Sequence, residues 1–281
     1  MAISNSLTKA NQKMGMAAYL TQEAVKQQIN NIVGGKNGTR FITSIVSAVQ
    51  TNPALQECTN QSILSAALLG ETLNLSPSPQ LSYFYMVPFN DKNRGKVAQF
   101  QIGYKGLIQL AIRSGQYKKI NVLSIKQGEL EYFDPMNEEI KVKLMVDDWN
   151  AREKAETIGY YAMFELTNGF TKAMYWSKEQ MENHALTYSQ GYRAKKGYTF
   201  WEKAFDRMAE KTMLKQLLSR WGIMSTELMT AIDADETVIN EDGTKNYVET
   251  EEVIDVPAPA PVPEEAPASA PDPAAALFGG K

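Results

Sequence analysis

The side chains with the most evident chemistry in this chain are basic, and they gather in two stretches. Eight lysines and arginines lie between Lys92 and Gly128, where no acidic residue occurs. Eight more lie between Arg193 and Arg220, together with three acids. Clusters of lysine and arginine are typical of surfaces that neutralise the phosphates of a nucleic acid. An ordinary solvated face would have the same composition, so both interpretations stay open.

Aromatic residues accompany both basic stretches. The first contains Tyr104 and Tyr117, and the second contains or adjoins Tyr192, Tyr198, Phe200 and Trp201. Bases stack on such rings while cations hold the backbone, so the mixture favours binding of single-stranded nucleic acid. Core aromatics lying behind a solvated face are the alternative.

Other reactive side chains are few. Cys58 is the single cysteine and His184 the single histidine, which excludes an internal disulfide and a Cys/His zinc site within the chain. We interpret Cys58 as a buried small hydrophobe and His184 as a surface or packing residue. Acidic doublets at 138–139 and 147–148 could supply carboxylates for two-metal nuclease chemistry. Neighbouring strand residues point to opposite faces, however, so neither doublet is a site by itself.

Two segments bear on phosphate binding. The sequence GGKNGTR at 34–40 lacks the spacing of a nucleotide-binding P-loop and follows no apolar strand, so we predict a flexible loop there. Lys105 follows a predicted strand and begins a predicted helix, where a phosphate could approach the helix N-terminus. The glycine spacing around it differs from a dinucleotide fingerprint. We therefore expect phosphate contacts without nucleotide hydrolysis.

The predicted elements follow an α+β order: N-terminal helices, a central antiparallel sheet with packed helices, and a disordered acidic tail rich in Pro and Ala. Helices are predicted at 39–50, 61–73 with a cap at Asn60, 104–113, from the Ser177/Gln180 capping box to about 188, and 200–221. Strands are predicted at 81–89, 96–102, 119–125, 128–133 and 139–146, followed by a hairpin of 157–166 and 170–176 that turns at Asn168-Gly169.

The last predicted helix divides into two faces. Trp201, Phe205, Met208, Ala209 and Thr212 share a packing face, whereas Lys203, Arg207, Lys211 and Lys215 follow the opposite one. Glu202, Asp206 and Glu210 lie between these faces and could neutralise some of the cations as helical pairs.

Charge divides the chain near residue 233. Residues 233–281 contain twelve acids and two bases, so they carry a net charge of −10, whereas residues 1–232 carry +7. We predict a folded, basic core at 1–232 that suits binding of a nucleic acid, and a flexible tail at 233–281. The tail either competes with DNA for the basic surface or docks a partner through Leu277 and Phe278. No apolar run is long enough for a membrane span and no secretory signal is evident, so we expect a cytoplasmic protein.

Three segments resemble the RecT/Red-beta family of phage single-strand annealing proteins, and its RecT branch most. They are SPSPQLSYFYMVPF at 76–89, QIGYKGLIQLAIRSG at 101–115 and FDRMAEKTMLKQLLSRWG at 205–222. The resemblance implies a non-enzymatic protein that anneals complementary DNA strands without ATP or another cofactor. It also implies that the 1–232 core is a DNA-binding, oligomerising core that forms rings or helical filaments in the cytoplasm of a bacterial host cell. The implied partners are single-stranded DNA, the annealed duplex, an exonuclease and a host single-strand-binding protein.

Combining the basic stretches with this resemblance, we predict one DNA-binding groove. Its members are Lys105, Arg113, Lys118, Lys119, Arg207, Lys211 and Lys215, with Tyr104 and Trp201 as aromatic members and Arg193, Lys195 and Lys196 as a clamp. Contacts to phosphates alone would tolerate any sequence, and base pairing would then supply specificity. The alternative functions are a passive single-strand-binding protein and a metal-dependent nuclease.

Overall fold

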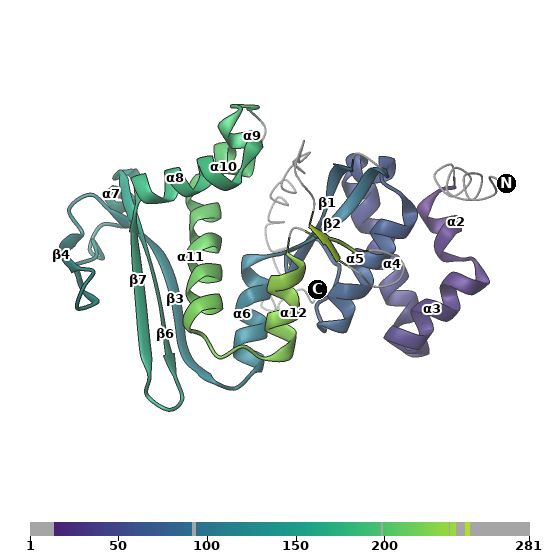
Figure 1. The fold of residues 1–281 in the computed structure, drawn as a ribbon, viewed down its shortest axis with the longest axis horizontal. Helices are drawn as coiled ribbons and strands as arrows, with labels where there is room; N and C mark the ends of the chain where they lie inside the picture. The colour runs from purple at the N-terminus through teal and green to yellow at the C-terminus, as the bar shows by residue number, and fades with distance from the viewer. Residues whose placement is uncertain (1–13, 92–93, 198, 236, 240–244, 248–281) are drawn as a thin grey trace, which may run out of the picture.

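The computed structural model describes residues 14–91, 94–197, 199–235, 237–239 and 245–247. The N-terminal helices form one end of an elongated molecule, a long three-stranded sheet lies toward the other end, and α6 and α12 lie between them (Figure 1). Every strand pair in the described residues is antiparallel. The predicted α+β class is confirmed.

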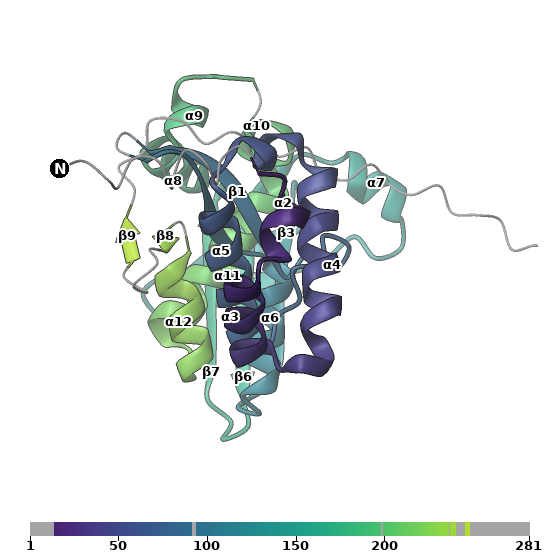
Figure 2. The same cartoon turned by 90° about the vertical axis from the view of Figure 1, so that its right-hand side faces the viewer.

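The N-terminal end consists of helices packed around apolar side chains such as Ile29, Ile45 and Leu64, all of which are fully buried. The helices are α2 (Met16–Leu20), α3 (Glu23–Val33), α4 (Gly35–Thr51), a 3-10 turn (Pro53–Glu57) and α5 (Asn60–Thr72). Helix α5 covers strand β2 (Gly95–Ile102), and Figure 2 shows this helical layer from the end of the molecule. A Cβ at Gly70 would lie 2.2 Å from the Phe84 ring, so the close contact between α5 and the sheet requires glycine there.

The first sheet combines strands from the N-terminal half of the chain with strands from residues 237–247. Its order is β1 (Phe84–Asp91), β2, β8 (Thr237–Ile239) and β9 (Lys245–Tyr247). Phe84 and Phe100 stack between β1 and β2 with ring centroids 5.1 Å apart. Strand β2 leads through Gly103 directly into α6 (Tyr104–Arg113), which has the bounds predicted from sequence.

The second sheet has the order β3 (Tyr117–Lys126), β6 (Thr157–Leu166) and β7 (Thr171–Ser177), and α11 (Phe205–Trp221) packs against it. Tyr160 and Phe164 of β6 and Met213 and Leu217 of α11 are fully buried. The remaining elements are a small ribbon of β4 (Leu130–Asp134) and β5 (Glu139–Val142), and the helices α7 (Trp149–Lys154), α8 (Lys178–Tyr188), α9 (Gln190–Arg193), α10 (Phe200–Lys203) and α12 (Thr226–Ala234).

The flexible loop predicted at 34–40 is wrong, because α4 begins at Gly35 and includes this segment. Gly34 forms the turn between α3 and α4 with a φ of 77°, a positive value that glycine adopts readily. At Gly38 a Cβ would lie 2.9 Å from Asn30 Oδ1, so a glycine lets α4 approach α3 closely. Packing between the two helices offsets the poor helix propensity of Gly35 and Gly38.

The caps, turns and helices predicted from local sequence are present, but several differ in the residues that form them. The Ser177/Gln180 capping box is present, but Thr59 caps α5 where Asn60 was predicted. In the β6–β7 turn only Gly169, with a φ of 88°, is left-handed. The helix predicted at 200–221 is interrupted at Ala204, whose φ of −148° ends α10 before α11 begins.

The boundary predicted at 232/233 falls inside α12. Asp235 follows this helix and is buried, and β8 then pairs with β2 at Phe100 and Thr237. Residues 248–281, including Leu277 and Phe278, lie outside the described residues. No helix in the described part of the chain is both long and apolar enough to cross a membrane.

Candidate nucleic-acid interface

Helix α6 places two predicted contact residues far apart. Lys105 and Arg113 are eight positions apart, which corresponds to about 12 Å along a helix axis. Lys105 is exposed, and none of the described residues forms an ion pair with it. Arg113 is also exposed, but its Nη1 donates a hydrogen bond of 3.1 Å to the carbonyl oxygen of Leu73. Lys105 is therefore open to a ligand, whereas part of the Arg113 guanidinium already binds the backbone.

Lys118 and Lys119 begin β3 and share one acid on the neighbouring strand. Their ammonium groups lie 2.5 Å and 3.0 Å from the carboxylate of Glu165. Hydrogen bonds from both lysines hold the pKa of Glu165 below its usual value. The two lysine side chains remain 59% and 64% exposed, and surface pairs of this kind are weak, so both could still turn to a phosphate.

Lys211 and Lys215 face inward, toward Asp235, rather than outward. Lys215 Nζ lies 2.5 Å from Asp235 Oδ2 and Lys211 Nζ lies 3.7 Å from Oδ1. Oδ1 also accepts a hydrogen bond of 3.0 Å from the backbone N–H of Ile102, and the Asp235 side chain has no exposed surface. This Asp235 junction joins α11 to the end of α12 and to β2. Sequence reasoning missed it because Asp235 was assigned to the acidic tail.

The acids of α10 and α11 do not pair with the cations of the same helices as predicted. Glu202 accepts hydrogen bonds from the Thr199 N–H and hydroxyl and from the Gly197 N–H. Asp206 accepts hydrogen bonds from the Tyr160 hydroxyl at 2.6 Å and from Thr157 at 2.9 Å. These carboxylates have other partners, and Lys203 and Arg207 form no ion pair among the described residues. Lys203 acts on Glu202, and Arg207 on Glu210, only through longer-range attraction, which favours the charged form of each acid.

Glu210 is the third acid of this series. Burial and the nearby Asp206 carboxylate raise its pKa above the usual range. The buried face of α11 consists of Ala209, Met213, Leu214, Leu217 and Leu218, so it is centred further along the helix than the face predicted from sequence.

The predicted clamp at 193–196 begins at the last residue of α9 and continues into the turn before α10, at the upper edge of Figure 1. Arg193, Lys195 and Lys196 are all exposed. Lys195 has a φ of 49° and Gly197 a φ of 78°, which turns the chain sharply here. No described acid forms an ion pair with Arg193 or Lys195.

The two predicted aromatic members have different environments. Trp201 is only 9% exposed and contacts Phe205 edge-on, at 5.1 Å between ring centroids, with Tyr192 at 6.3 Å. This tryptophan therefore packs in an aromatic cluster beneath the clamp. Tyr104 is partly exposed, and burial, followed by the charge of Glu210, raises the pKa of its hydroxyl.

Apart from Lys196, which is exposed in the clamp, the predicted groove cations thus fall into three groups. The first, which we term the open cation group, consists of Lys105, Arg193, Lys195 and Arg207, and no member has an ion pair within the described chain. Lys105 and Arg207 lie in the first turns of α6 and α11, and Arg193 and Lys195 belong to the clamp. Arg113, Lys118 and Lys119 lie around the lower turn from α6 to β3. Lys211 and Lys215 belong to the Asp235 junction.

The remaining reactive residues have structural environments. Cys58 is buried, which raises the pKa of its thiol to about 12. His184 packs between Trp176 and Tyr188, with ring centroids at 5.5 Å and 4.5 Å, as a packing residue would. No group of three or more His, Cys, Asp or Glu side chains in the described residues could hold a metal ion.

Comparisons with known proteins agree with the resemblance to the RecT family found in the sequence. Residues 39–251 match the model of the RecT family. The chain is 41% identical over 241 residues to the uncharacterized protein YqaK of Bacillus subtilis (strain 168), which covers 85% of this chain and 78% of YqaK. It is also 26% identical over 236 residues to Protein RecT of Escherichia coli (strain K12), which covers 83% and 84% of the two chains.

Proposed function

Since the chain belongs to the RecT family, we propose that it anneals complementary single strands of DNA without ATP. Family membership supports a protein of phage-type recombination that binds DNA and anneals strands. The finer assignment, to a surface of this molecule, rests on the open cation group. Its four members are the predicted contacts that are exposed at the surface and have no acid within ion-pair distance in the described chain.

The open cation group suits a strand held by its phosphates. Charges at Lys105, Arg193, Lys195 and Arg207 would attract the backbone of one strand, and each contact would release counterions. None of these contacts requires a particular base. A strand bound in this way leaves its base edges free, so a second strand can test complementarity by pairing alone.

Arg113, Lys118 and Lys119 extend this surface around the lower end of α6. We assign them weaker contacts because the Leu73 carbonyl and the Glu165 carboxylate already engage them. Lys211 and Lys215 take a structural role, because a phosphate would have to replace a buried carboxylate at the Asp235 junction. Assembly into rings or filaments, and binding of an exonuclease or a host single-strand-binding protein, complete the proposal.

The test uses two complementary oligonucleotides, one with a fluorophore and one with a quencher. We expect the purified protein to accelerate quenching in buffer without nucleotide, and added ATP to leave the rate unchanged. Acceleration only with ATP would contradict the proposal. Tight binding without acceleration would indicate passive strand binding, and shortened strands on a denaturing gel after addition of Mg²⁺ would indicate a nuclease.

A further inference from the structure

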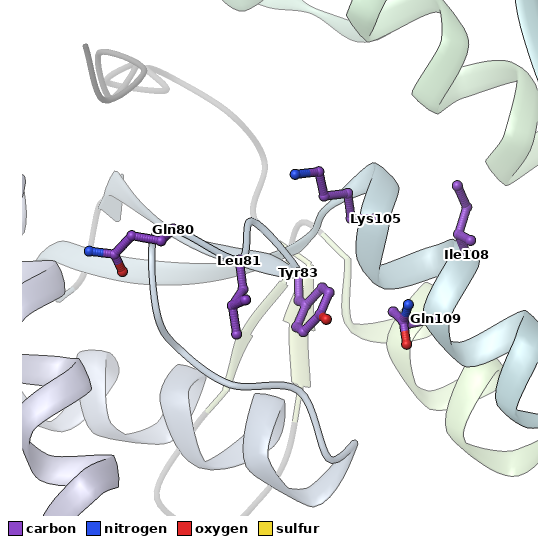
Figure 3. Close-up of a pocket in the computed structure, with 6 residues that line it drawn as sticks. All are labelled: Gln80, Leu81, Tyr83, Lys105, Ile108 and Gln109. Atoms are coloured by element: carbon purple, nitrogen blue, oxygen red, sulfur yellow. The ribbon is translucent and has the colours of Figure 1, made fainter. Parts of the chain in front are cut away.

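A cavity of about 250 Å³ lies between α6 and the segment that precedes β1. Six residues line it: Gln80, Leu81, Tyr83, Lys105, Ile108 and Gln109. Figure 3 shows the ring of Tyr83 between Leu81 and Gln109, with Lys105 directed away from them at the start of α6. One member of the open cation group therefore stands at the rim of a defined hollow.

The backbone fixes the two walls of this cavity. The Gly103 N–H donates a hydrogen bond of 2.8 Å to the Tyr83 carbonyl oxygen. A Cβ at Gly103 would lie 2.3 Å from the Ser82 carbonyl oxygen, and one at Gly106 would lie 2.1 Å from that of Tyr83. Both glycines are thus needed for α6 to approach the 80–83 segment so closely, and the cavity exists before any ligand binds.

Strain is stored in the same wall. Ser82 has a φ of 55°, a left-handed conformation that is unfavourable for a residue with a side chain. Its hydroxyl donates a hydrogen bond of 3.2 Å to the Pro79 carbonyl oxygen. Strained backbone of this kind persists where surrounding contacts impose it and is concentrated at ligand-binding positions. Here it directs Leu81 and Tyr83 to the same cavity.

The lining matches the chemistry of one nucleobase. Leu81, Ile108 and the Tyr83 ring offer apolar surface to a flat ring, and the Gln109 amide offers both a donor and an acceptor to its edge. The Gln80 amide adds N–H donors, while its oxygen accepts a hydrogen bond of 2.5 Å from the Ser78 hydroxyl. An amide that can both donate and accept suits any of the four bases. Lys105 at the rim can hold the phosphate of the same nucleotide.

We propose that this cavity receives one unstacked base of each DNA segment bound by a subunit. The inference rests on the proposed function, because it takes the DNA strand to pass over Lys105. Docking one base would fix the register of the strand on the protein, while neighbouring bases stay available for pairing. Binding would therefore depend on the presence of bases but not on their identity.

The experiment compares two strands of equal length and charge, one of ordinary mixed sequence and one made only of abasic tetrahydrofuran nucleotides. We expect the wild-type protein to bind the ordinary strand about tenfold more tightly, as expected for stacking of a base on protein side chains. Ile108→Trp fills the cavity and should reduce this preference to near unity. Ile112→Trp is the matched control, because it adds the same bulk to the same helix outside the lining, at a residue that is 56% exposed.

Leu81→Ala provides a second variant, which should leave the stability of the core unchanged because Leu81 is 37% exposed. It should reduce the preference partially, with an unchanged circular dichroism spectrum. A full preference in folded Ile108→Trp and Leu81→Ala proteins would overturn the base pocket while leaving the proposed function intact. Failure of the wild-type protein to bind either strand would instead contradict the proposed function.

Discussion

Two pairs of cations from the two basic stretches have different environments. Lys211 and Lys215 point to Asp235, which is fully buried, whereas Lys105 and Arg207 face solvent with no ion pair in the described chain. The first pair stabilises the contact of α11 with β2 and the end of α12. The second pair is available to phosphates. Cations that look alike in the sequence therefore have two different roles. Those that pair with Asp235 stabilise the fold, and those without an acid partner in the described chain are available to bind DNA.

Truncation provides the strongest test of the structural part. A protein of residues 1–232 loses Asp235 and β8, so it should lose at least about 3 kcal/mol of unfolding free energy, as when a buried ion pair is broken. A protein of residues 1–247 keeps both and should unfold in urea like the full chain. Equal stability of the two truncated proteins would contradict a structural role for this segment.

The 1–247 protein also tests the acidic tail. If the tail competes with DNA for the basic surface, its removal should tighten binding to single strands at low salt.

Asp235→Ala isolates the Asp235 junction. The variant leaves two partly buried lysines and the Ile102 N–H without their shared acceptor, so we expect a loss of about 3 kcal/mol in urea unfolding. Asp147→Ala, at an exposed acid, is the control and should be neutral. If both variants unfolded alike, the junction would contribute nothing measurable.

Glu210 predicts a dependence of stability on pH. Its pKa is raised in the folded protein, chiefly by burial, so the folded state holds this proton more tightly than the unfolded chain does. Its contribution to stability is full below the usual pKa of a glutamic acid and is lost as the pH rises through the raised value. Glu210→Gln should flatten this decline in unfolding midpoints measured from acidic to neutral pH. A decline of the same size in the variant would assign it to another group.

Glu165→Gln should have a smaller effect, on DNA affinity. Removing the carboxylate frees Lys118 and Lys119, so single-strand affinity at low salt should rise about twofold, given the weakness of surface ion pairs. Glu131→Gln makes the same change of charge at an exposed site on β4 and serves as the control. An unchanged dissociation constant, measured by fluorescence anisotropy, would place both lysines away from the DNA.

Sequence reasoning predicted much of the fold and less of the site. The period-2 pattern and the capping box located β6, β7 and α8, and the glycine before Tyr104 located the start of α6, because these signals are local. Most of α4 was predicted as a helix at 39–50, but its first turn at 35–38 was missed because packing on α3 stabilises it against the poor helix propensity of its glycines. The Asp235 junction was missed because it joins residues that are 20 or more positions apart, and composition cannot reveal which lysine an acid will meet.

The central claim is that the open cation group contacts DNA phosphates, and the salt dependence of single-strand binding tests it most directly. The double variant Lys105→Gln/Arg207→Gln should lower the slope of log Kd against log salt by up to about 1.4, about 0.7 for each lost contact. The matched control Lys141→Gln/Lys143→Gln removes the same charge from exposed positions in and beside β5, outside the proposed path, and should leave the slope unchanged. Equal slopes in the wild-type protein and both variants would contradict the claim and place the DNA on another surface.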